Sequence, residues 1–303
     1  LINNLKNSKV LVVGDLMLDE YVIGNVDRIS PEAPIPVLDV KDVKFVPGGA
    51  ANTANNIKAL GDRVFIAGVI GADEKGQLLK QLLKERGINV EGLVVDSRRK
   101  TTLKTRAMAK DQQIVRIDIE NKNPIDPDTE NKLLDFIRAK ITEVNAVVIS
   151  DYAKGVVTPS LSKKIISLCQ QNSVISLVDP KGADYSKYRG CYIITPNKKE
   201  LAEALNLSLS QIESEPKFLQ AGKMLLSHVM SNCVLVTQGA EGMTLFKGNS
   251  EVFHYSAINK NAIDVSGAGD TNIGTFSLAL GAGADPKDAA VLASHACGIV
   301  VGK

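Results

Sequence analysis

Residues 126–149 have the sequence DPDTENKLLDFIRAKITEVNAVVI, and this stretch decides the fold class. It opens with Asp126 and Pro127, an N-cap and a first-turn proline that together predict the start of a helix. The helix carries one apolar stripe, formed by Leu133, Leu134, Ile137 and Ile141. Residues 146–149 are continuously apolar, which is typical of a short strand buried on both faces. A helix that leads into a buried strand predicts an α/β fold.

The same alternation runs along most of the chain. Further buried strands are predicted at residues 10–13, 64–69, 174–178, 192–194 and 234–236. Amphipathic helices lie between them: one at 76–86 ends before Gly87, and another begins at Thr158 and Pro159. We therefore predict one domain over residues 1–303, with a mostly parallel sheet between two layers of helices.

Two stretches break this pattern, at approximately residues 20–43 and 99–120. The first contains Pro31, Pro34 and Pro36, and the second alternates polar and apolar residues without a helical period. Alternation with a period of two predicts extended strands with one face toward solvent. A second interpretation is that both stretches are irregular surface loops.

The segment Gly267-Ala268-Gly269-Asp270 precedes a helix-compatible run that extends to Leu280. Two glycines let backbone N–H groups converge on one point, and the N-terminus of a helix adds partial positive charge. These features predict an anion site formed by the first amides of the helix. A carboxylate beside it is suited to take a proton from an attacking hydroxyl, so Asp270 is the candidate general base. The alternative is a glycine-rich turn in which Asp270 is only a helix cap.

Polar residues follow five of the predicted strands. They are Gly14-Asp15, Ser150-Asp151, Asp179-Pro180-Lys181, Thr195-Pro196-Asn197 and Thr237-Gln238-Gly239. In an open α/β sheet, ligands bind beyond the carboxyl ends of the strands, so these residues are expected to line one edge together with Asp270. Taken singly, each is also an ordinary strand-to-helix turn, where Asp, Asn and Ser are favoured.

Two well-separated motifs resemble the signatures of one family. Gly267 to Asp270, preceded by Asp264-Val265-Ser266, is similar to the C-terminal signature of the ribokinase-like (PfkB) carbohydrate kinases, and Gly48-Gly49-Ala50-Ala51-Asn52 is similar to their N-terminal one. The resemblance implies an ATP- and Mg²⁺-dependent sugar kinase with a ribokinase-like three-layer α/β fold. It also implies that the two extended stretches pair into a small β-sheet lid, through which two copies form a homodimer.

The resemblance further implies roles for individual residues. The sugar side would be formed by Asp15, Asp19, Gly48, Gly49 and Asn52. Asn197 and Glu200 would hold the phosphates and, through water, Mg²⁺, and the nucleotide would be lined by Thr237, Gly239 and Gly242. The anion hole beside Asp270 would be formed by Gly267, Ala268 and Gly269. Asp264 matches a position that shapes a monovalent-cation site, which could take K⁺, in some relatives, and Asn272 departs from the aromatic or apolar residue common at its position.

The lid stretches discriminate between substrates better than the kinase signatures do. Residues 28–37, 101–106 and 112–116 resemble those of the heptose 7-phosphate kinases within the family. That resemblance implies phosphorylation of D-glycero-β-D-manno-heptose 7-phosphate at C1, in the synthesis of ADP-heptose for lipopolysaccharide core. A substrate that already bears a phosphate needs cations apart from the ATP site, and the candidates are Lys104, Arg106, Arg116, Lys154 and Lys181. Each of these can instead be an ordinary solvated side chain.

Other functions stay open from the residues alone. One is a kinase for ribose or fructose 6-phosphate, and another is a catalytically silent sugar-binding regulator. A dinucleotide-dependent oxidoreductase is disfavoured, because Gly14-Asp15-Leu16 follows the first strand where such a protein carries Gly-x-Gly-x-x-Gly. Turnover of ATP separates the kinases from the other two classes.

Composition narrows the partners and the compartment. The chain has 36 Lys and Arg against 34 Asp and Glu, with no long block of one charge, which favours small molecules over nucleic acid or a membrane surface. Its 4 dispersed cysteines predict reduced thiols, and no apolar run approaches the ~18 residues of a membrane span, so we expect a cytoplasmic protein. Relatives continue beyond the last helix of this chain, so we expect a truncated fold with any nucleotidyltransferase domain beyond Lys303.

Overall fold

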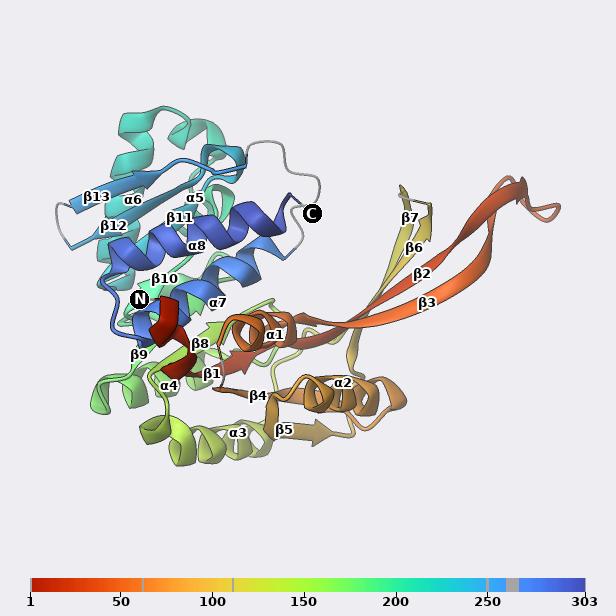
Figure 1. Ribbon diagram of the computed structural model, residues 1–303, viewed down its shortest axis with the longest axis horizontal. Coiled ribbons are helices and arrows are strands. Elements are labelled where there is room, and N and C mark those ends of the chain that lie inside the picture. The colour runs from red at the N-terminus through yellow and green to blue at the C-terminus, as the bar shows by residue number, and fades with distance from the viewer. Residues whose placement is uncertain (1, 62, 111, 249–250, 260–266, 303) are drawn as a thin grey trace.

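The computed structural model describes residues 2–61, 63–110, 112–248, 251–259 and 267–302. Within these residues a nine-stranded sheet forms the middle of the body, in the order β13-β12-β11-β10-β9-β8-β1-β4-β5 (Figure 1). Its strands are β1 (Lys9–Gly14), β4 (Arg63–Gly71), β5 (Asn89–Asp96), β8 (Ala146–Ser150), β9 (Ile175–Asp179), β10 (Ile193–Ile194), β11 (Cys233–Thr237), β12 (Met243–Lys247) and β13 (Glu251–Tyr255). In this sheet, neighbouring strands pair in parallel from β11 to β5, whereas β12 pairs antiparallel with both β11 and β13.

Helices cover both faces of this sheet. One face carries α1 (Ala50–Leu60), α2 (Glu74–Glu85), α7 (Ala268–Gly281) and α8 (Pro286–Val300). The other carries α3 (Pro127–Lys140), α4 (Pro159–Gln171), α5 (Lys198–Ala204) and α6 (Glu215–Val229). Short 3-10 turns span Ile2–Asn7, Ile141–Glu143, Tyr185–Tyr188, Leu209–Ile212 and Gly239–Glu241. Because successive strand residues point to opposite faces, Val10 and Val12 join the first core while Leu11 and Val13 join the second, which confirms the three-layer prediction.

Local signals place the helix starts as predicted. The Asp126 carboxylate accepts the N–H groups of Asp128 and Thr129 at 2.9 and 3.1 Å, and Thr158 caps α4. The helix predicted at 76–86 begins earlier, at Glu74, because Asp73 caps it. Three strands escaped prediction: β5 and β13 are the edges of the sheet and are only partly buried, and β12 places a polar Thr244 in a buried position.

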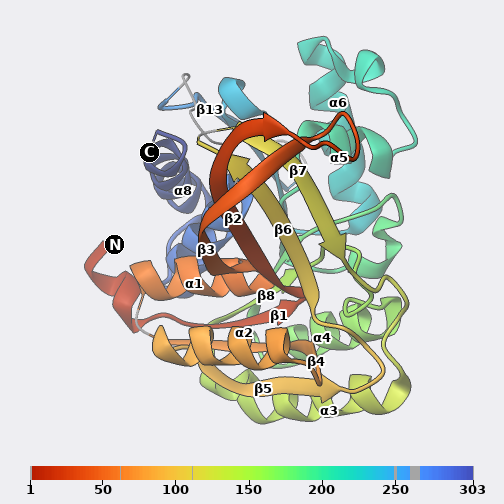
Figure 2. The same cartoon turned by 90° about the vertical axis from the view of Figure 1, so that its right-hand side faces the viewer.

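A second, four-stranded sheet forms a lid that projects from the body (Figures 1 and 2). Its order is β3-β2-β6-β7, with strands β2 (Leu16–Ile29), β3 (Pro36–Gly49), β6 (Thr102–Ala109) and β7 (Gln112–Ile119). The lid prediction is therefore confirmed over the loop alternative. Strands β2 and β3 extend beyond the predicted range of residues 20–43 and reach into the body. The prediction missed the start of β2 because Leu16, Met17 and Leu18 are all buried and so lack the alternation that marks a one-sided strand.

Candidate active site

The carboxyl ends of β1, β8, β9, β10 and β11 lie side by side, since these strands are parallel neighbours. Backbone hydrogen bonds join the turns that follow them. The N–H of Asp15 donates to the carbonyl of Ser150 at 3.1 Å, and the N–H of Asp151 donates to the carbonyl of Asp179 at 3.0 Å. The predicted polar edge is thus one continuous surface.

Helix α7 begins at this edge. Gly267 caps it with φ of 76°, in the left-handed region that glycine adopts without strain. The N–H and Oγ1 of Thr271 both donate to the carbonyl of Gly267, at 2.9 and 3.0 Å, and close the first turn. The first amides of a helix have no intrahelical acceptor, so those of Ala268, Gly269 and Asp270 are available to an anion. Asp264, the candidate for a monovalent-cation site, lies outside the described residues.

Asp270 is buried, with 6% of its surface exposed, yet its carboxylate is well hydrogen-bonded. Oδ2 accepts a bond from Asn52 Nδ2 at 2.7 Å. Oδ1 accepts two bonds, from Thr53 Oγ1 at 2.8 Å and from the Tyr152 hydroxyl at 2.6 Å. Burial raises the pKa of Asp270, and the three donors act in the opposite direction. A carboxylate with a raised pKa at a ligand edge is suited to proton transfer.

Asp15, predicted on the sugar side, supports a loop in this structure. Its Oδ2 accepts the N–H groups of Tyr152 and Lys154 at 2.8 and 3.0 Å, and its Oδ1 accepts that of Val156 at 3.0 Å. Burial, and then the charge of Asp151, raise the pKa of Asp15. Oδ2 thus accepts two amides, whereas Oδ1 accepts one within the described chain, so the predicted sugar contact of Asp15 stays a prediction.

The remaining predicted sugar residues gather at the base of the lid. Asp19 on β2 pairs with Arg106 on β6 at 2.6 Å. Gly48 on β3 leaves room for Asp19, because a Cβ there would lie 2.4 Å from Asp19 Oδ2. Gly49 has φ of 57° and caps α1, which directs Asn52 toward Asp270. These side chains are assembled in one place, although Asp19 and Asn52 are already bonded within the chain.

A pocket of about 290 Å³ lies between the turn after β11 and the start of α7. Its lining includes Thr237, Gly239, Gly242, Ala268 and Gly269, so the predicted nucleotide residues and the predicted anion hole share one cavity. Asn272 also lines the pocket; it is 2% exposed, and its Oδ1 has no hydrogen-bond partner within the described chain.

Asn197 and Glu200 form a capping box at the start of α5. The N–H of Glu200 donates to Asn197 Oδ1 at 2.9 Å, and the N–H of Asn197 donates to Glu200 Oε2 at 3.0 Å. Lys181 Nζ lies 2.7 Å from Glu200 Oε1. Lys181 therefore lies beside a predicted nucleotide residue and apart from the lid, and its predicted role as a substrate cation stays a prediction.

The model of the pfkB family carbohydrate kinases matches residues 7–303. The chain belongs to the PfkB family. The bifunctional protein HldE of Geobacter metallireducens is 44% identical over 298 residues, which cover 98% of this chain and 60% of that protein. HldE of Helicobacter pylori is 45% identical over 295 residues, covering 97% of this chain and 63% of that protein. This PfkB chain therefore spans less than two-thirds of the length of these relatives.

Solved structures agree with the family. Phosphofructokinase-2 from Escherichia coli in complex with potassium superposes with a TM-score of 0.79 at 20% identity, covering 97% of this chain and 92% of that one. Arabidopsis thaliana ribokinase complexed with ribose and ATP gives 0.74 at 19% identity, covering 98% and 93%. These identities show the ribokinase-like fold alone. The family match over residues 7–303 makes this chain a carbohydrate kinase and rules out the oxidoreductase.

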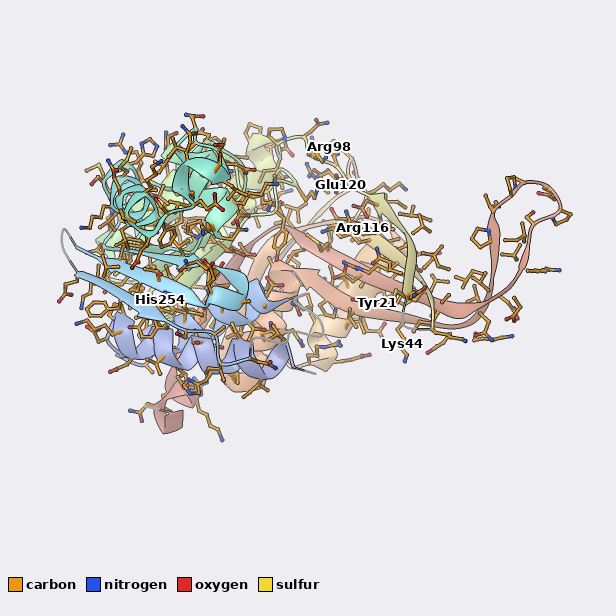
Figure 3. The ribbon with its side chains drawn as sticks, turned by 90° about the horizontal axis from the view of Figure 1, so that it is seen from above. Tyr21, Lys44, Arg98, Arg116, Glu120 and His254 are labelled. Atoms are coloured by element: carbon orange, nitrogen blue, oxygen red, sulfur yellow. The ribbon has the colours of Figure 1, made fainter. Side chains whose placement is uncertain are left out.

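Four of the five predicted substrate cations of this PfkB kinase lie on or near the lid. Lys104 and Arg106 are two residues apart on β6, and Lys104 Nζ lies 5.7 Å from the centroid of the Tyr152 ring. Arg116 is directly opposite Arg106 on β7 and pairs with Asp118 at 2.9 Å. Lys154 pairs with Glu120 at 2.5 Å. Figure 3 labels Glu120 nearer the body than Arg116.

Tyr152 and Thr53 are site residues that no sequence motif singles out. Tyr152 directly follows Asp151 at the polar edge, and Thr53 follows Asn52, so both stood beside residues that were singled out. Their hydroxyl groups alone gave no sign of a shared partner, since Asp270 lies 118 and 217 positions away in the chain.

No group of three or more His, Cys, Asp or Glu side chains in the described chain could hold a metal ion by itself. Mg²⁺ in phosphoryl transfer is usually held by one or two carboxylates together with substrate phosphates, so a single carboxylate is compatible with it. Both oxygens of Glu200 are engaged by Lys181 and Asn197, which fits contact through water better than direct ligation. None of the described helices is both long and apolar enough to cross a membrane.

Proposed function

We propose that this PfkB kinase transfers the γ-phosphoryl group of ATP to the C1 hydroxyl of D-glycero-β-D-manno-heptose 7-phosphate, a step toward ADP-heptose. One observation carries the proposal: Asp270, in the first turn of α7, is bonded to Tyr152, whose ring lies 5.7 Å from Lys104 Nζ on the lid strand β6. The lid cations are separate from the nucleotide pocket, as a substrate with its own phosphate requires. The HldE name of the similar proteins supports a heptose substrate.

The reaction assigns a task to each part of the edge. Asp270 accepts the proton of the C1 hydroxyl as that oxygen bonds to the γ-phosphorus and the bond to ADP breaks. The amides of Ala268 and Gly269 stabilise the charge on the phosphoryl oxygens. Glu200 and Asn197 would hold Mg²⁺ through water, and the ion would neutralise phosphate charge when bound.

Charge at the base of the lid supports a phosphate site there. Burial lowers the pKa of Lys104, and the nearby cations Lys154 and Arg116 also lower it, against the opposing effect of Asp19 and Asp118. A partly desolvated ammonium group beside like charges is stabilised by an anion. The 7-phosphate is a ligand of the right charge for this position.

A coupled ATP-consumption assay tests the substrate. Heptose 7-phosphate should exceed free heptose, ribose and fructose by about 10³-fold or more in kcat/KM, because cations built to bind a phosphate are left unpaired by an unphosphorylated sugar. Mass spectrometry should identify the 1,7-bisphosphate. If ribose or fructose 6-phosphate were used as efficiently as heptose 7-phosphate, the chain would still be a PfkB kinase, but the proposed substrate would be wrong. Replacing K⁺ by tetramethylammonium in the same assay tests a monovalent-cation requirement near Asp264.

We also propose that the lid forms a homodimer. Ile117 and Ile119 pair with Thr105 and Leu103, so they lie on the face of the lid opposite Lys104 and Arg106. We call this the outer face. Ile117 and Ile119 are 56% and 48% exposed there. An exposed apolar sheet face on a projecting lid favours association with a second copy.

A further inference from the structure

Tyr152 is anchored at both of its ends. Its backbone N–H donates to Asp15 Oδ2 at 2.8 Å, and its hydroxyl donates to Asp270 Oδ1 at 2.6 Å. The second distance is in the short range typical of a hydroxyl bonded to a carboxylate. Tyr152 thus connects a buried carboxylate at the end of β1 with the candidate base on α7.

The two oxygens of Asp270 are not equivalent. An ionised carboxylate oxygen has two lone-pair positions in the carboxylate plane. Oδ1 accepts bonds from Thr53 and Tyr152, which occupy both of its positions, whereas Oδ2 accepts only the bond from Asn52 within the described chain. Oδ2 therefore keeps the capacity to accept one more hydrogen bond.

We propose that Tyr152 is a positioning residue that holds Oδ1 of Asp270 and so makes Oδ2 the oxygen that receives the proton of the sugar hydroxyl. This inference rests on the proposed phosphoryl transfer. In that step the hydroxyl O–H bond breaks and its proton moves to Oδ2. The electron pair left on the sugar oxygen forms the new bond to phosphorus, and ADP leaves with the electrons of the broken P–O bond.

Two features keep Tyr152 a constant donor. Burial and the charge of Asp270 raise the pKa of the Tyr152 hydroxyl well above its ordinary value, so it stays protonated while Asp270 titrates. The loop that carries it is fixed by Asp15, which also accepts the N–H groups of Lys154 and Val156. Ala153, next in the chain, has φ of 55°, a conformation that a non-glycine residue adopts only where its surroundings hold it. The predicted sugar carboxylate Asp15 therefore acts on the base through Tyr152.

The test compares Tyr152→Phe with Tyr185→Phe in the pH dependence of kcat/KM for the sugar phosphate. A carboxylate that loses a donor ionises less readily, so Tyr152→Phe should move the acid limb up by about one pH unit, the equivalent of one charge-assisted hydrogen bond. Tyr185 is a matched control, because it is also buried and its hydroxyl has no partner in the described chain. Tyr185→Phe should therefore leave the acid limb of the kcat/KM profile at the parental pH.

A second measurement does not depend on turnover. The carboxylate of Asp270 can be titrated in the free protein by infrared difference spectroscopy, with Asp270→Asn as the reference that lacks the signal. Tyr152→Phe should raise this pKa by the same amount as the kinetic limb, and Thr53→Val, which removes the other Oδ1 donor, should raise it in the same direction.

The outcomes separate the two proposals. A fall in kcat with neither the limb nor the infrared titration displaced would mean that Tyr152 only supports the loop, and the inference would be overturned. If infrared titration shows that Tyr152→Phe raises the pKa of Asp270, but the parent protein phosphorylates no sugar, the positioning role is supported and the proposed function is refuted. If Tyr152→Phe does not unfold cooperatively, Thr53→Val decides: an unmoved titration there overturns the assignment of Oδ1.

Discussion

Replacing Asp270 by asparagine removes the candidate base and keeps the shape of its side chain. The amide oxygen can keep the bond from Asn52, and the amide NH₂ can donate to the hydroxyls of Thr53 and Tyr152. This exchange is possible because a hydroxyl accepts as well as donates. We therefore expect the variant to fold with the same local geometry.

Turnover should fall steeply in this variant. An amide cannot take the proton of the sugar hydroxyl, and a general base contributes about 10²–10⁴-fold to the rate. A loss of about 10³-fold corresponds to ~4 kcal/mol of transition-state stabilisation. The KM for ATP should change little, because the backbone amides of Ala268 and Gly269, which we propose bind the phosphates, are left in place by the substitution.

The free energy of unfolding of Asp270→Asn, unlike its turnover, should not fall. Burial raises the pKa of Asp270 in the folded protein, so the ionised form is less favourable there than in the unfolded chain. This cost is absent below the ordinary aspartate pKa of about 3.9 and grows as the pH rises through the higher folded-state pKa. Asp270→Asn has no charge to bury. At pH 7 it should be at least as stable as the parent, and the difference should shrink in acid.

Steady-state ADP release and thermal unfolding at pH 7 and in acid measure both effects. Asp288→Asn is a matched control, since Asp288 also lies in the first turn of a helix but is exposed. It should retain parental turnover. Turnover of Asp270→Asn within about threefold of the parent would refute a general base on this scale. Lost turnover with a lower unfolding midpoint would instead indicate damage to the fold.

Other variants probe the lid and the nucleotide pocket. Arg106→Ala removes the charge-assisted contact that we propose to the 7-phosphate, worth roughly 1.5–3 kcal/mol, so the KM for the sugar phosphate should rise at least about tenfold while the KM for ATP stays constant; equal effects on both would mean a structural role, such as the bond to Asp19. Asn272→Leu removes a buried oxygen that has no hydrogen-bond partner in the described part of the chain and so costs about 1–3 kcal/mol; differential scanning fluorimetry should show a higher unfolding midpoint, and a lower midpoint would mean that this oxygen has a partner. Ile117→Lys places a charge on the outer face, so light scattering should report a monomer that still unfolds cooperatively; an unchanged dimer would rule out this face.

Local patterns in the sequence were enough for the fold class and for the family. The helix cap at Asp126 and the apolar run at 146–149 depend only on residues close by in the chain, so both can be recognised without a structure. The same holds for residues 267–270, whose glycines and helix start form one continuous motif. The lid strands could be predicted where one face meets solvent, because polar and apolar residues alternate there. The buried residues Leu16–Leu18 show no alternation, so this end of the lid could not be predicted.

The sequence by itself therefore determined an α/β carbohydrate kinase with a β lid, a candidate base and a polar edge. Only the tertiary structure decided which side chains meet. Asn52 reaches Asp270 across 218 positions and Tyr152 reaches it across 118, and Lys181 pairs with Glu200 on the nucleotide side. Such contacts depend on strand order and on the path of loops such as the one that Asp15 holds. Periodicity and spacing report only on neighbours in the chain, so they cannot show that Asp15, a carboxylate predicted to bind the sugar, also supports the loop of the tyrosine beside the base.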